Sequence, residues 1–314
     1  MFNPFGFGEE VVRDRIVVLG RRRAGKTIYL ARLYEAAWNG AHSDLHMRAL
    51  PGPGNAHETF MDIIARLQRG EWPESTIGST STAIDVDYKG ERHLMIALDY
   101  PGEVFRRAFV HDSQEESAAE LREHVDRAAA VILLLDPEVA VTGEVGEYVD
   151  DDYGMSEAIR RIRDSSDGQN VPVAIVLTKC DLHAAMIKAE GGMREFVNRR
   201  YSNIVRVATS PRRRFAASAV RASRRSDGEI VPNLGYEPEG IIEPMTYCVE
   251  LMARGLREDS ARQAAENFAQ SQASAQQAQV EADRNAAMGV AVIGSIVVMV
   301  VGLLALVLFL FLGS

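Results

Sequence analysis

Apolar residues along this chain form short uninterrupted runs that alternate with longer stretches of helical character. Short apolar runs bounded by turn residues are typical of buried strands, and the intervening stretches are typical of helices that cover a sheet. The predicted strands are 16–19, 83–88, 93–98, 130–135, 173–177 and 215–218, and the predicted helices are 26–38, 57–69, 114–127, 155–163 and 239–256. This alternation predicts an α/β fold with a mostly parallel sheet and helices on both of its faces.

The second and third predicted strands are joined by a tight turn, Lys89-Gly90-Glu91. A turn this short connects antiparallel neighbours, since parallel strands need a long crossover. We therefore expect one antiparallel edge strand on an otherwise parallel sheet. The pattern contains no internal repeat, so we predict one globular domain over residues 15–256, preceded by an N-terminal extension of residues 1–14.

The far end of the chain departs from this pattern. Residues 288–312 form a run of 25 residues that carries no charge and whose only hydroxyl belongs to Ser295. At about 1.5 Å per residue, a helix of this length crosses a hydrocarbon core of ~30 Å. We expect residues 287–312 to be a transmembrane tail anchor in a lipid bilayer. Because Arg284 stands just before it, the positive-inside tendency places the N-terminal body in the cytoplasm.

Residues 257–286, between the body and this run, are rich in alanine, glutamine and serine and contain neither proline nor glycine. Such a composition favours helix without offering a broad apolar face, so a helical linker or stalk is predicted. Within the following apolar helix, small residues recur every four positions at Ala287, Ala291 and Ser295. This spacing permits the close helix approach that a homodimer would use.

Charge and cysteine content narrow the function classes. The 314 residues carry a formal net charge of −9, which argues against a body that binds nucleic acid by bulk electrostatics. The two cysteines, Cys180 and Cys248, provide neither a disulfide framework nor a paired-cysteine metal site, and they suit a reducing cytosol. We therefore expect no nucleic-acid partner.

The most specific motif follows the first predicted strand, where Gly20-Arg21-Arg22-Arg23-Ala24-Gly25-Lys26-Thr27 leads into a helix. It has the G-x-x-x-x-G-K-[ST] pattern of a phosphate-binding loop in the required strand-to-helix context. The glycines let successive N–H groups and a helix N-terminus face the phosphates of a nucleotide. Lys26 would reach the outer phosphates, and Thr27 would bind Mg²⁺.

A second element ends the third predicted strand, at Asp99-Tyr100-Pro101-Gly102. The carboxylate of Asp99 would hold Mg²⁺ through water, and the N–H of Gly102 would contact the γ-phosphate and release it on hydrolysis. Such a D-x-x-G pattern is common by chance. Its position after a strand, downstream of the phosphate-binding loop, makes a chance match less probable.

Two further elements indicate the base. Thr178-Lys179-Cys180-Asp181 follows the fifth predicted strand and matches the [NT]-K-x-D pattern. One carboxylate at Asp181 can accept from both the N1–H and the exocyclic amine of guanine, a pair of donors that adenine lacks, and the stem of Lys179 would lie over the base. Ala217-Ser218-Ala219 ends the last strand and resembles the S-A element whose N–H contacts guanine O6.

Together these four elements resemble the GTPases of the translation-factor-related (TRAFAC) class over about residues 15–256. The arginine-rich loop, Trp72-Pro73 and Gly240-Ile241-Ile242-Glu243-Pro244 are similar to prokaryotic double-GTPase-type domains. The resemblance implies a P-loop NTPase fold, GTP and GDP as ligands, Mg²⁺ as cofactor, and a switch threonine that closes over Mg²⁺ and the γ-phosphate. Thr76 is the first choice for that threonine, because it follows the Trp-Pro turn, and the alternatives are Thr80 and Thr82.

One residue departs from the small-GTPase pattern. Glu103 occupies the position where many small GTPases place the glutamine that orients the attacking water. A carboxylate is repelled by the γ-phosphate, so slow intrinsic hydrolysis is predicted. An arginine of the loop, with Arg22 as the candidate, would stabilise transition-state charge, and the alternative is that the loop arginines face solvent or pair with acids. The catalytic candidates are Lys26, Glu103 and Arg22.

The sequence therefore predicts a membrane-tethered GTP-binding switch that hydrolyses GTP slowly to GDP and phosphate, and that recruits or releases unidentified protein partners at the cytoplasmic membrane face. The alternative is a membrane-anchored scaffold or effector subunit with a structural nucleotide and negligible hydrolysis. Glu103 keeps this alternative open.

Other polar clusters have less specific readings. Six arginines bracket the guanine-recognition end and would form either a solvated loop or a contact with anionic lipid headgroups; they are Arg212, Arg213, Arg214, Arg221, Arg224 and Arg225. Asp150-Asp151-Asp152 is predicted to be a solvated turn rather than a metal site. His111, His124 and His183 have no metal-ligand or catalytic-triad spacing.

Overall fold

The computed structural model describes residues 13–20, 24–40, 44–51, 56–74, 80–99, 102–142, 145–164, 168–209 and 211–255, and beyond them 257–258, 261, 264–272, 274, 276 and 299–302. The chain divides into two compact units, Met1–Arg254 and Gly255–Ser314. The first unit contains all of the strands described and the candidate site.

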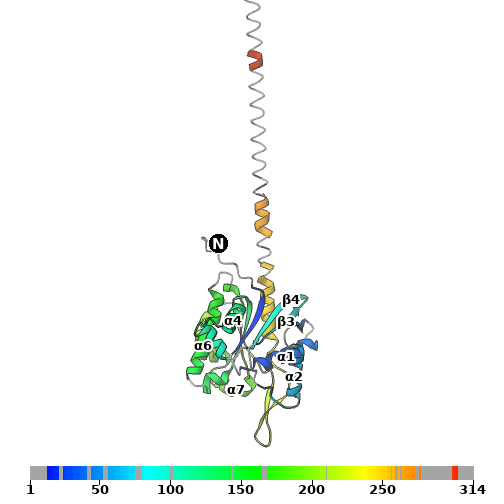
Figure 1. The fold of residues 1–314 in the computed structure, drawn as a ribbon, viewed down its shortest axis with the longest axis vertical. Helices are drawn as coiled ribbons and strands as arrows, with labels where there is room; N and C mark the ends of the chain where they lie inside the picture. The colour runs from blue at the N-terminus through cyan, green and yellow to red at the C-terminus, as the bar shows by residue number, and fades with distance from the viewer. Residues whose placement is uncertain are drawn as a thin grey trace, which may run out of the picture. The chain divides into compact units, whose positions relative to one another are not determined.

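A seven-stranded sheet, ordered β2-β3-β4-β1-β5-β6-β7 among the described residues, forms the centre of the first unit (Figure 1). The pairings of β1 with β4 and β5, of β5 with β6, and of β6 with β7 are all parallel. The strands are β1 Arg15–Gly20, β2 Leu45–Ala49, β3 Thr80–Tyr88, β4 Glu91–Asp99, β5 Ala128–Leu135, β6 Val173–Leu177 and β7 Arg212–Ala216. The predicted α/β fold with a mostly parallel sheet is confirmed.

The antiparallel edge of the sheet is also confirmed. β3 runs antiparallel to β4, and Lys89 and Gly90 in the turn between them have φ angles of 54° and 82°. Positive φ at both central residues is what a two-residue hairpin of the I′ type requires. β2, which the sequence did not predict, pairs antiparallel with β3 and forms the outermost strand. Its five residues, Leu45–Ala49, were too few and too polar to stand out as an apolar run.

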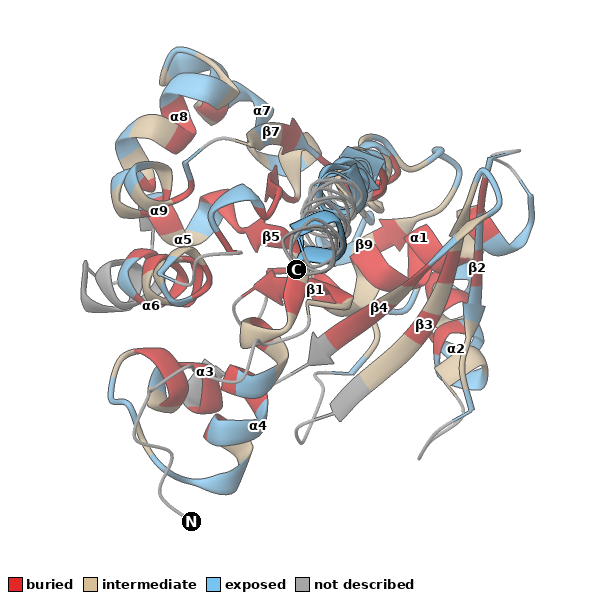
Figure 2. Cartoon of the chain, turned by 90° about the horizontal axis from the view of Figure 1, so that it is seen from above, coloured by how far each residue is buried: buried red, intermediate tan, exposed pale blue. Residues whose placement is uncertain are grey.

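Helices cover both faces of the sheet, as predicted. Ile16 and Val18 of β1 belong to a core with α1, α2 and a helix over 243–255, whereas Val17 and Leu19 belong to a core with α3, α4, α6, α8 and α9. Figure 2 shows the buried residues on the central strands between these layers. The alternation follows from the two-residue side-chain period of a strand. The first helices are α1 Lys26–Trp38, α2 Ala56–Gln68, α3 Gly102–Phe109, α4 Glu116–Asp126 and α5 Pro137–Thr142, followed by α6 Val145–Arg163, α7 Cys180–Ala189, α8 Met193–Arg200 and α9 Ser202–Val207.

α6 begins at Val145, ten residues before the predicted start, and includes Asp150-Asp151-Asp152. The prediction of a solvated turn there is wrong. Asp152 is buried, and its carboxylate accepts hydrogen bonds from the N–H groups of Asn203 and Ile204, each at 3.1 Å, in the first turn of α9. Burial raises the pKa of Asp152, and these donors offset part of that rise. An acid that caps a helix far along the chain cannot be recognised from its local sequence.

The described residues of the second unit, Gly255–Ser314, are helical, including 264–272 and 299–302. Nowhere in the part of the chain that the structure describes does a helix have the length and apolar composition needed to cross a bilayer. Apart from 299–302, the predicted anchor at 287–312 lies outside the described residues. The anchor therefore stays a prediction, as does a homodimer through its small residues.

Candidate functional site

The carboxyl ends of the parallel strands lie along one edge of the sheet. Their registers pair Gly20 with Leu134, Leu135 with Leu177, and Leu177 with Ala216. The residues that follow β1, β5, β6 and β7 therefore form a row across this edge. In open parallel sheets, ligands bind outside the carboxyl ends of the strands. The described candidate residues gather at this edge.

The loop between β1 and α1 is suited to phosphate. Gly25 has a φ of 78°, a left-handed conformation that glycine adopts without strain, and it has no side chain to cap α1. Lys26 begins α1, is 5% exposed, and donates from Nζ to the main-chain oxygen of Gly20 at 2.7 Å. The first turn, Lys26–Tyr29, contains no acid. A helix N-terminus whose N-cap residue has no side chain, beside a lysine, fits an anionic ligand.

The other residues predicted in this loop are described in part. Ala24 is buried, and Thr27 is half-buried on the first turn of α1. Arg22 lies outside the described residues, so its predicted contact with the transition state stays a prediction.

The predicted Mg²⁺ residues are described through their backbone. Asp99 ends β4 opposite Thr80 of β3, and Gly102 begins α3. Since β4 is the parallel neighbour of β1, Asp99 lies at the edge where Gly20 ends. The side chains of Asp99 and Glu103 are outside the described residues, and so is Thr76. Their roles stay predictions.

The Thr178-Lys179-Cys180-Asp181 segment connects β6 to α7. Thr178 is buried and donates from both its N–H and its Oγ1 to the main-chain oxygen of Leu135, at 2.9 and 3.0 Å. Lys179 has a φ of 53°, which is uncommon for a residue other than glycine. Burial raises the pKa of the Cys180 thiol to about 11, and its Sγ donates to the oxygen of Leu177. Cys180 is thus a neutral thiol that packs the turn.

Asp181 is held by two donors from the segment that follows β7. Ser218 is buried and donates from Oγ to Oδ1 of Asp181 at 2.6 Å, and the N–H of Ala222 lies 3.4 Å from Oδ2. Ala219 follows Ser218 and packs against the core. The structure thus brings together the predicted Asp181 and the predicted S-A element. Their contact fixes the direction of the carboxylate.

A pocket of about 500 Å³ opens beside this carboxylate. Its size falls within the roughly 300–1,000 Å³ of small-ligand sites. Asp181 and Ser218 line it, together with Arg221 and Tyr236, and the guanidinium of Arg221 lies 4.6 Å from the centre of the Tyr236 ring. The carboxylate of Asp181 therefore faces a space that can hold a planar base.

The sequence missed the hairpin that forms part of this pocket. β8, Arg221–Arg224, pairs antiparallel with β9, Ile230–Asn233. The far end of the hairpin contacts the segment before the predicted switch threonine, because Nε1 of Trp72 donates to the main-chain oxygen of Ile230 at 2.9 Å. Only a Gly-containing turn between two short runs signalled this hairpin in the sequence.

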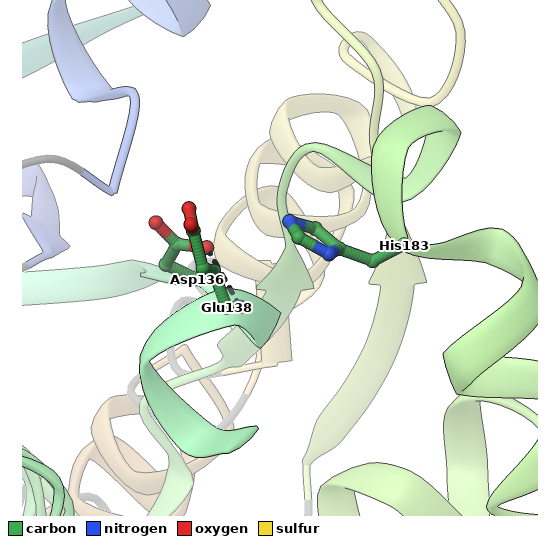
Figure 3. Close-up of side chains that lie close together, drawn as sticks. All are labelled: Asp136, Glu138 and His183. Atoms are coloured by element: carbon green, nitrogen blue, oxygen red, sulfur yellow. Dashed lines mark hydrogen bonds between the residues drawn. The ribbon is translucent and has the colours of Figure 1, made fainter. Parts of the chain in front are cut away.

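A second missed residue is Asp136, which follows β5. Its Oδ2 accepts from Nζ of Lys179 at 2.6 Å. Asp136 also lies near Glu138 and His183, whose ligand atoms are all within 4.8 Å of one another (Figure 3). Oδ1 of Asp136 accepts from the N–H of Glu138 at 3.0 Å, so both oxygens already have donors. An ammonium group on the same carboxylate makes this cluster a poor cation site.

The six arginines near this end of the sheet have local partners, and both predicted alternatives, a solvated loop and a headgroup contact, stay predictions. Main-chain oxygens accept from Arg212 and Arg224, Asn198 accepts from Arg214, the ring of Phe215 lies beneath Arg213, Glu239 pairs with Arg221, and Glu229 pairs with Arg225. The ion pairs weaken the attraction of Arg221 and Arg225 to an anionic surface, whereas the neutral partners leave the charge of the other four arginines uncompensated.

Solved structures similar to this chain include three nucleotide-binding proteins. The Arl6 BBS3 small GTPase from Trypanosoma brucei, with bound nucleotide analogue GppNp, is 14% identical over 77% of this chain and 98% of its own, with a TM-score of 0.39. The putative nucleolar GTP-binding protein 1 from Plasmodium falciparum is 11% identical over 80% and 92%, with a TM-score of 0.43. Roco2 RocCORdC from Methanosarcina barkeri, bound to GDP, is 18% identical over 78% and 50%, with a TM-score of 0.36. Similarity at these TM-scores does not indicate a function.

No curated protein matches the chain significantly. The profile of the Double-GTPase 1 family, in contrast, matches residues 17–182, which is more than half of the chain. The match runs from β1 through Asp181 and so includes the phosphate-binding loop and the Thr178-Lys179-Cys180-Asp181 element. The chain belongs to the Double-GTPase 1 family.

Proposed function

We propose that this protein is a membrane-tethered guanine-nucleotide switch that binds GTP and GDP. The observation that carries the proposal is the Asp181 carboxylate, which Ser218 and Ala222 hold at the wall of the pocket. Guanine offers two adjacent donors to such a carboxylate, and adenine lacks this pair of donors. Membership of the Double-GTPase 1 family supports the same ligand.

The phosphates would lie at the other end of the same edge. The N–H groups at the start of α1 and the ammonium of Lys26 face that position, with Gly25 providing the left-handed turn. Thr27, Asp99 and Thr76 are the proposed Mg²⁺ residues. When bound, Mg²⁺ would neutralise charge on the phosphates.

The proposed reaction is attack of water on the γ-phosphate, which gives GDP and phosphate. Lys26 would stabilise the developing charge, and Glu103 in place of a water-orienting glutamine would keep hydrolysis slow. Single-turnover hydrolysis by the full chain tests this. Glu103→Gln should raise the rate and Arg22→Ala should lower it. Unchanged rates in both variants would remove these residues from the mechanism.

The proposed switch couples bound GTP to the segments around Thr76 and Gly102, which would recruit or release a protein partner. Hydrogen exchange of the full chain with a non-hydrolysable GTP analogue and with GDP tests this. We expect slower exchange at 75–80 and 100–103 with the analogue. Equal exchange in the two complexes, together with negligible turnover, would favour a scaffold with a structural nucleotide.

The proposed organisation is an N-terminal extension over 1–14, a GTPase domain over 15–256 of the translation-factor-related class, a helical linker over 257–286 and a tail anchor over 287–312, with the domain in the cytoplasm. The uncharged run at 288–312 supports the anchor. The full chain should float with membranes after alkaline extraction, and deletion of 287–312 should release it. A deletion variant that still floats would place the attachment elsewhere.

A further inference from the structure

Asp136 is a buried acid fixed in place by three hydrogen bonds. The residue is 6% exposed. Its Oδ1 accepts from the N–H of Glu138, and its main-chain oxygen accepts from the hydroxyl of Tyr201 at 2.8 Å. Its Oδ2 accepts from Nζ of Lys179 at 2.6 Å. Asp136 is therefore a rigid acceptor for the one long, mobile side chain among its partners.

Lys179 crosses the sheet edge to reach this acceptor. Its backbone follows β6, and its ammonium ends at Asp136, which follows the neighbouring strand β5. β5 lies in turn beside β1, the strand that leads into the phosphate-binding loop. The lysine stem thus lies along the edge between the proposed phosphate end and Asp181. Its left-handed backbone, with a φ of 53°, is the kind of local strain that functional sites retain.

We propose that Asp136 is the positioning residue for guanine binding, because it holds the Lys179 stem as a preformed wall for the face of the base. This inference rests on the proposed function and assigns to the base site a residue outside the recognised motifs. The side chain of Lys179 is 29% exposed, so without its acceptor it would be free to rotate into solvent. Fixing the stem before binding removes that ordering cost from the binding step.

The competing reading of this cluster is a cation site shared by Asp136, Glu138 and His183. In Figure 3 the His183 ring faces the two carboxylates, and its buried Nε2 has no hydrogen-bond partner among the described residues. A cation would have to displace the ammonium of Lys179 from Asp136. Because Lys179 belongs to the proposed base site, the geometry favours positioning over cation binding.

The test measures equilibrium binding of three probes to the full chain in Mg²⁺: GDP, inosine diphosphate and tripolyphosphate. Asp136→Asn removes the charge but keeps an oxygen for the N–H of Glu138. We expect this variant to bind GDP and inosine diphosphate more weakly by the same factor, about tenfold. The factor should be the same because the Lys179 stem would contact the face of the base and not the exocyclic amine, which guanine has and hypoxanthine lacks. Tripolyphosphate binding and the thermal midpoint of the free protein should stay unchanged.

Two variants serve as controls. Glu138→Gln neutralises the neighbouring exposed carboxylate of the cluster, and because the described acceptor of the Lys179 ammonium is Asp136, GDP binding should not change. In a Lys179→Ala background, Asp136→Asn should have no further effect on GDP affinity, because the two residues act through one contact.

Several outcomes would overturn the proposal. An unchanged GDP affinity in Asp136→Asn, with normal GDP binding by the unmodified chain, would refute it and leave the proposed function standing. An equal loss of GDP affinity in Glu138→Gln would indicate that the cluster of Asp136, Glu138 and His183 binds a cation. Weaker tripolyphosphate binding or a lower thermal midpoint in Asp136→Asn would mean that Asp136 stabilises the fold and does not act specifically on the base site. No GDP binding by the unmodified chain would refute the proposed function and this inference together.

Discussion

The two ends of the candidate nucleotide site are built in opposite ways. The phosphate end consists of consecutive residues between β1 and α1, and it relies on main-chain N–H groups, one glycine conformation and Lys26. The base end takes its side chains from the ends of three strands, with Asp136 after β5, Asp181 after β6 and Ser218 after β7. A short motif can specify the first end, whereas only the folded sheet assembles the second.

This difference predicts how each end fails. A main-chain site tolerates most side-chain changes but not the loss of its lysine, and that loss affects every nucleotide alike. A site assembled from side chains is sensitive to changes at residues far apart in the sequence, and those changes affect bases differently.

The largest expected effect is at the phosphate end. Lys26→Ala removes a buried ammonium aimed at the loop, and we expect GTP and ATP binding to weaken equally, by about 100-fold. Isothermal calorimetry on the full chain measures both affinities. Lys188→Ala, which changes an exposed lysine of α7, is the matched control. A loss confined to GTP would contradict the division between the two ends.

At the base end, Ser218→Ala removes the donor to Oδ1 of Asp181. We expect GTP binding to weaken by about tenfold, since a hydrogen bond to a charged group contributes about 1.5–3 kcal/mol. Tripolyphosphate binding should not change. Ser223→Ala is the matched control, because Ser223 lines the same pocket and its Oγ bonds to Asn233 instead. Equal effects of the two changes on GTP affinity would contradict the role of Ser218 in holding Asp181.

A smaller effect is expected where the hairpin meets the segment before the proposed switch. Trp72→Phe keeps a ring but removes the donor to Ile230, which should destabilise the docked hairpin by about 1 kcal/mol. Hydrogen exchange over 221–233 should become faster, and GTP affinity should change less than in Ser218→Ala. Trp38→Phe, at a tryptophan that stacks on Tyr34, is the comparison. Unchanged exchange would mean that the hairpin is held by other contacts.

The smallest effect is expected away from both ends, at Asp14, which precedes the amino end of β1. Burial opposes its ionisation, but Arg15 and Arg127 outweigh burial and hold the pKa of Asp14 below its ordinary value of 3.8. A lowered pKa in the folded state means that these ion pairs stabilise the protein above that pH and lose their effect as pH falls through the folded pKa. Solvent screening limits the contribution to about 0.5 kcal/mol.

Denaturant unfolding of the full chain and of Asp14→Asn checks this. The variant should be less stable near neutral pH, and the difference should shrink in acid, while GTP affinity stays the same. A change in affinity would show that the site is not confined to the carboxyl edge.

The regular parts of the fold were predictable because their signals are local. The predicted helix at 26–38 coincides with α1, and the predicted strand at 173–177 coincides with β6. β2 was missed because it is short and half polar. The predicted start of α6 was too late because the sequence alone indicates a surface acid at Asp152, whose partner in α9 is adjacent only in the folded chain. Local pattern cannot report a partner that the chain meets only after folding.

The same division holds within the candidate site. Lys26, Asp181 and Ser218 were predicted because they stand in motifs whose order along the chain is informative. Asp136 was missed because one acid after an apolar run has no motif, and its contact with Lys179 exists only when β5 and β6 lie side by side. The β8–β9 hairpin was missed for the same reason, since its pocket-lining role depends on Asp181 and Tyr236.

The most direct test of the account is base selectivity in the full chain and in Asp181→Asn, measured by competition among GTP, ATP and xanthosine triphosphate. Xanthine has a carbonyl where guanine has its amine, so the amide of the variant can donate where the carboxylate could only accept. We predict that the unmodified chain prefers GTP over ATP by 100-fold or more and that the variant loses this preference and gains xanthosine triphosphate binding. Guanine selectivity that survives the substitution would contradict the assignment of Asp181 and the guanine site built on it.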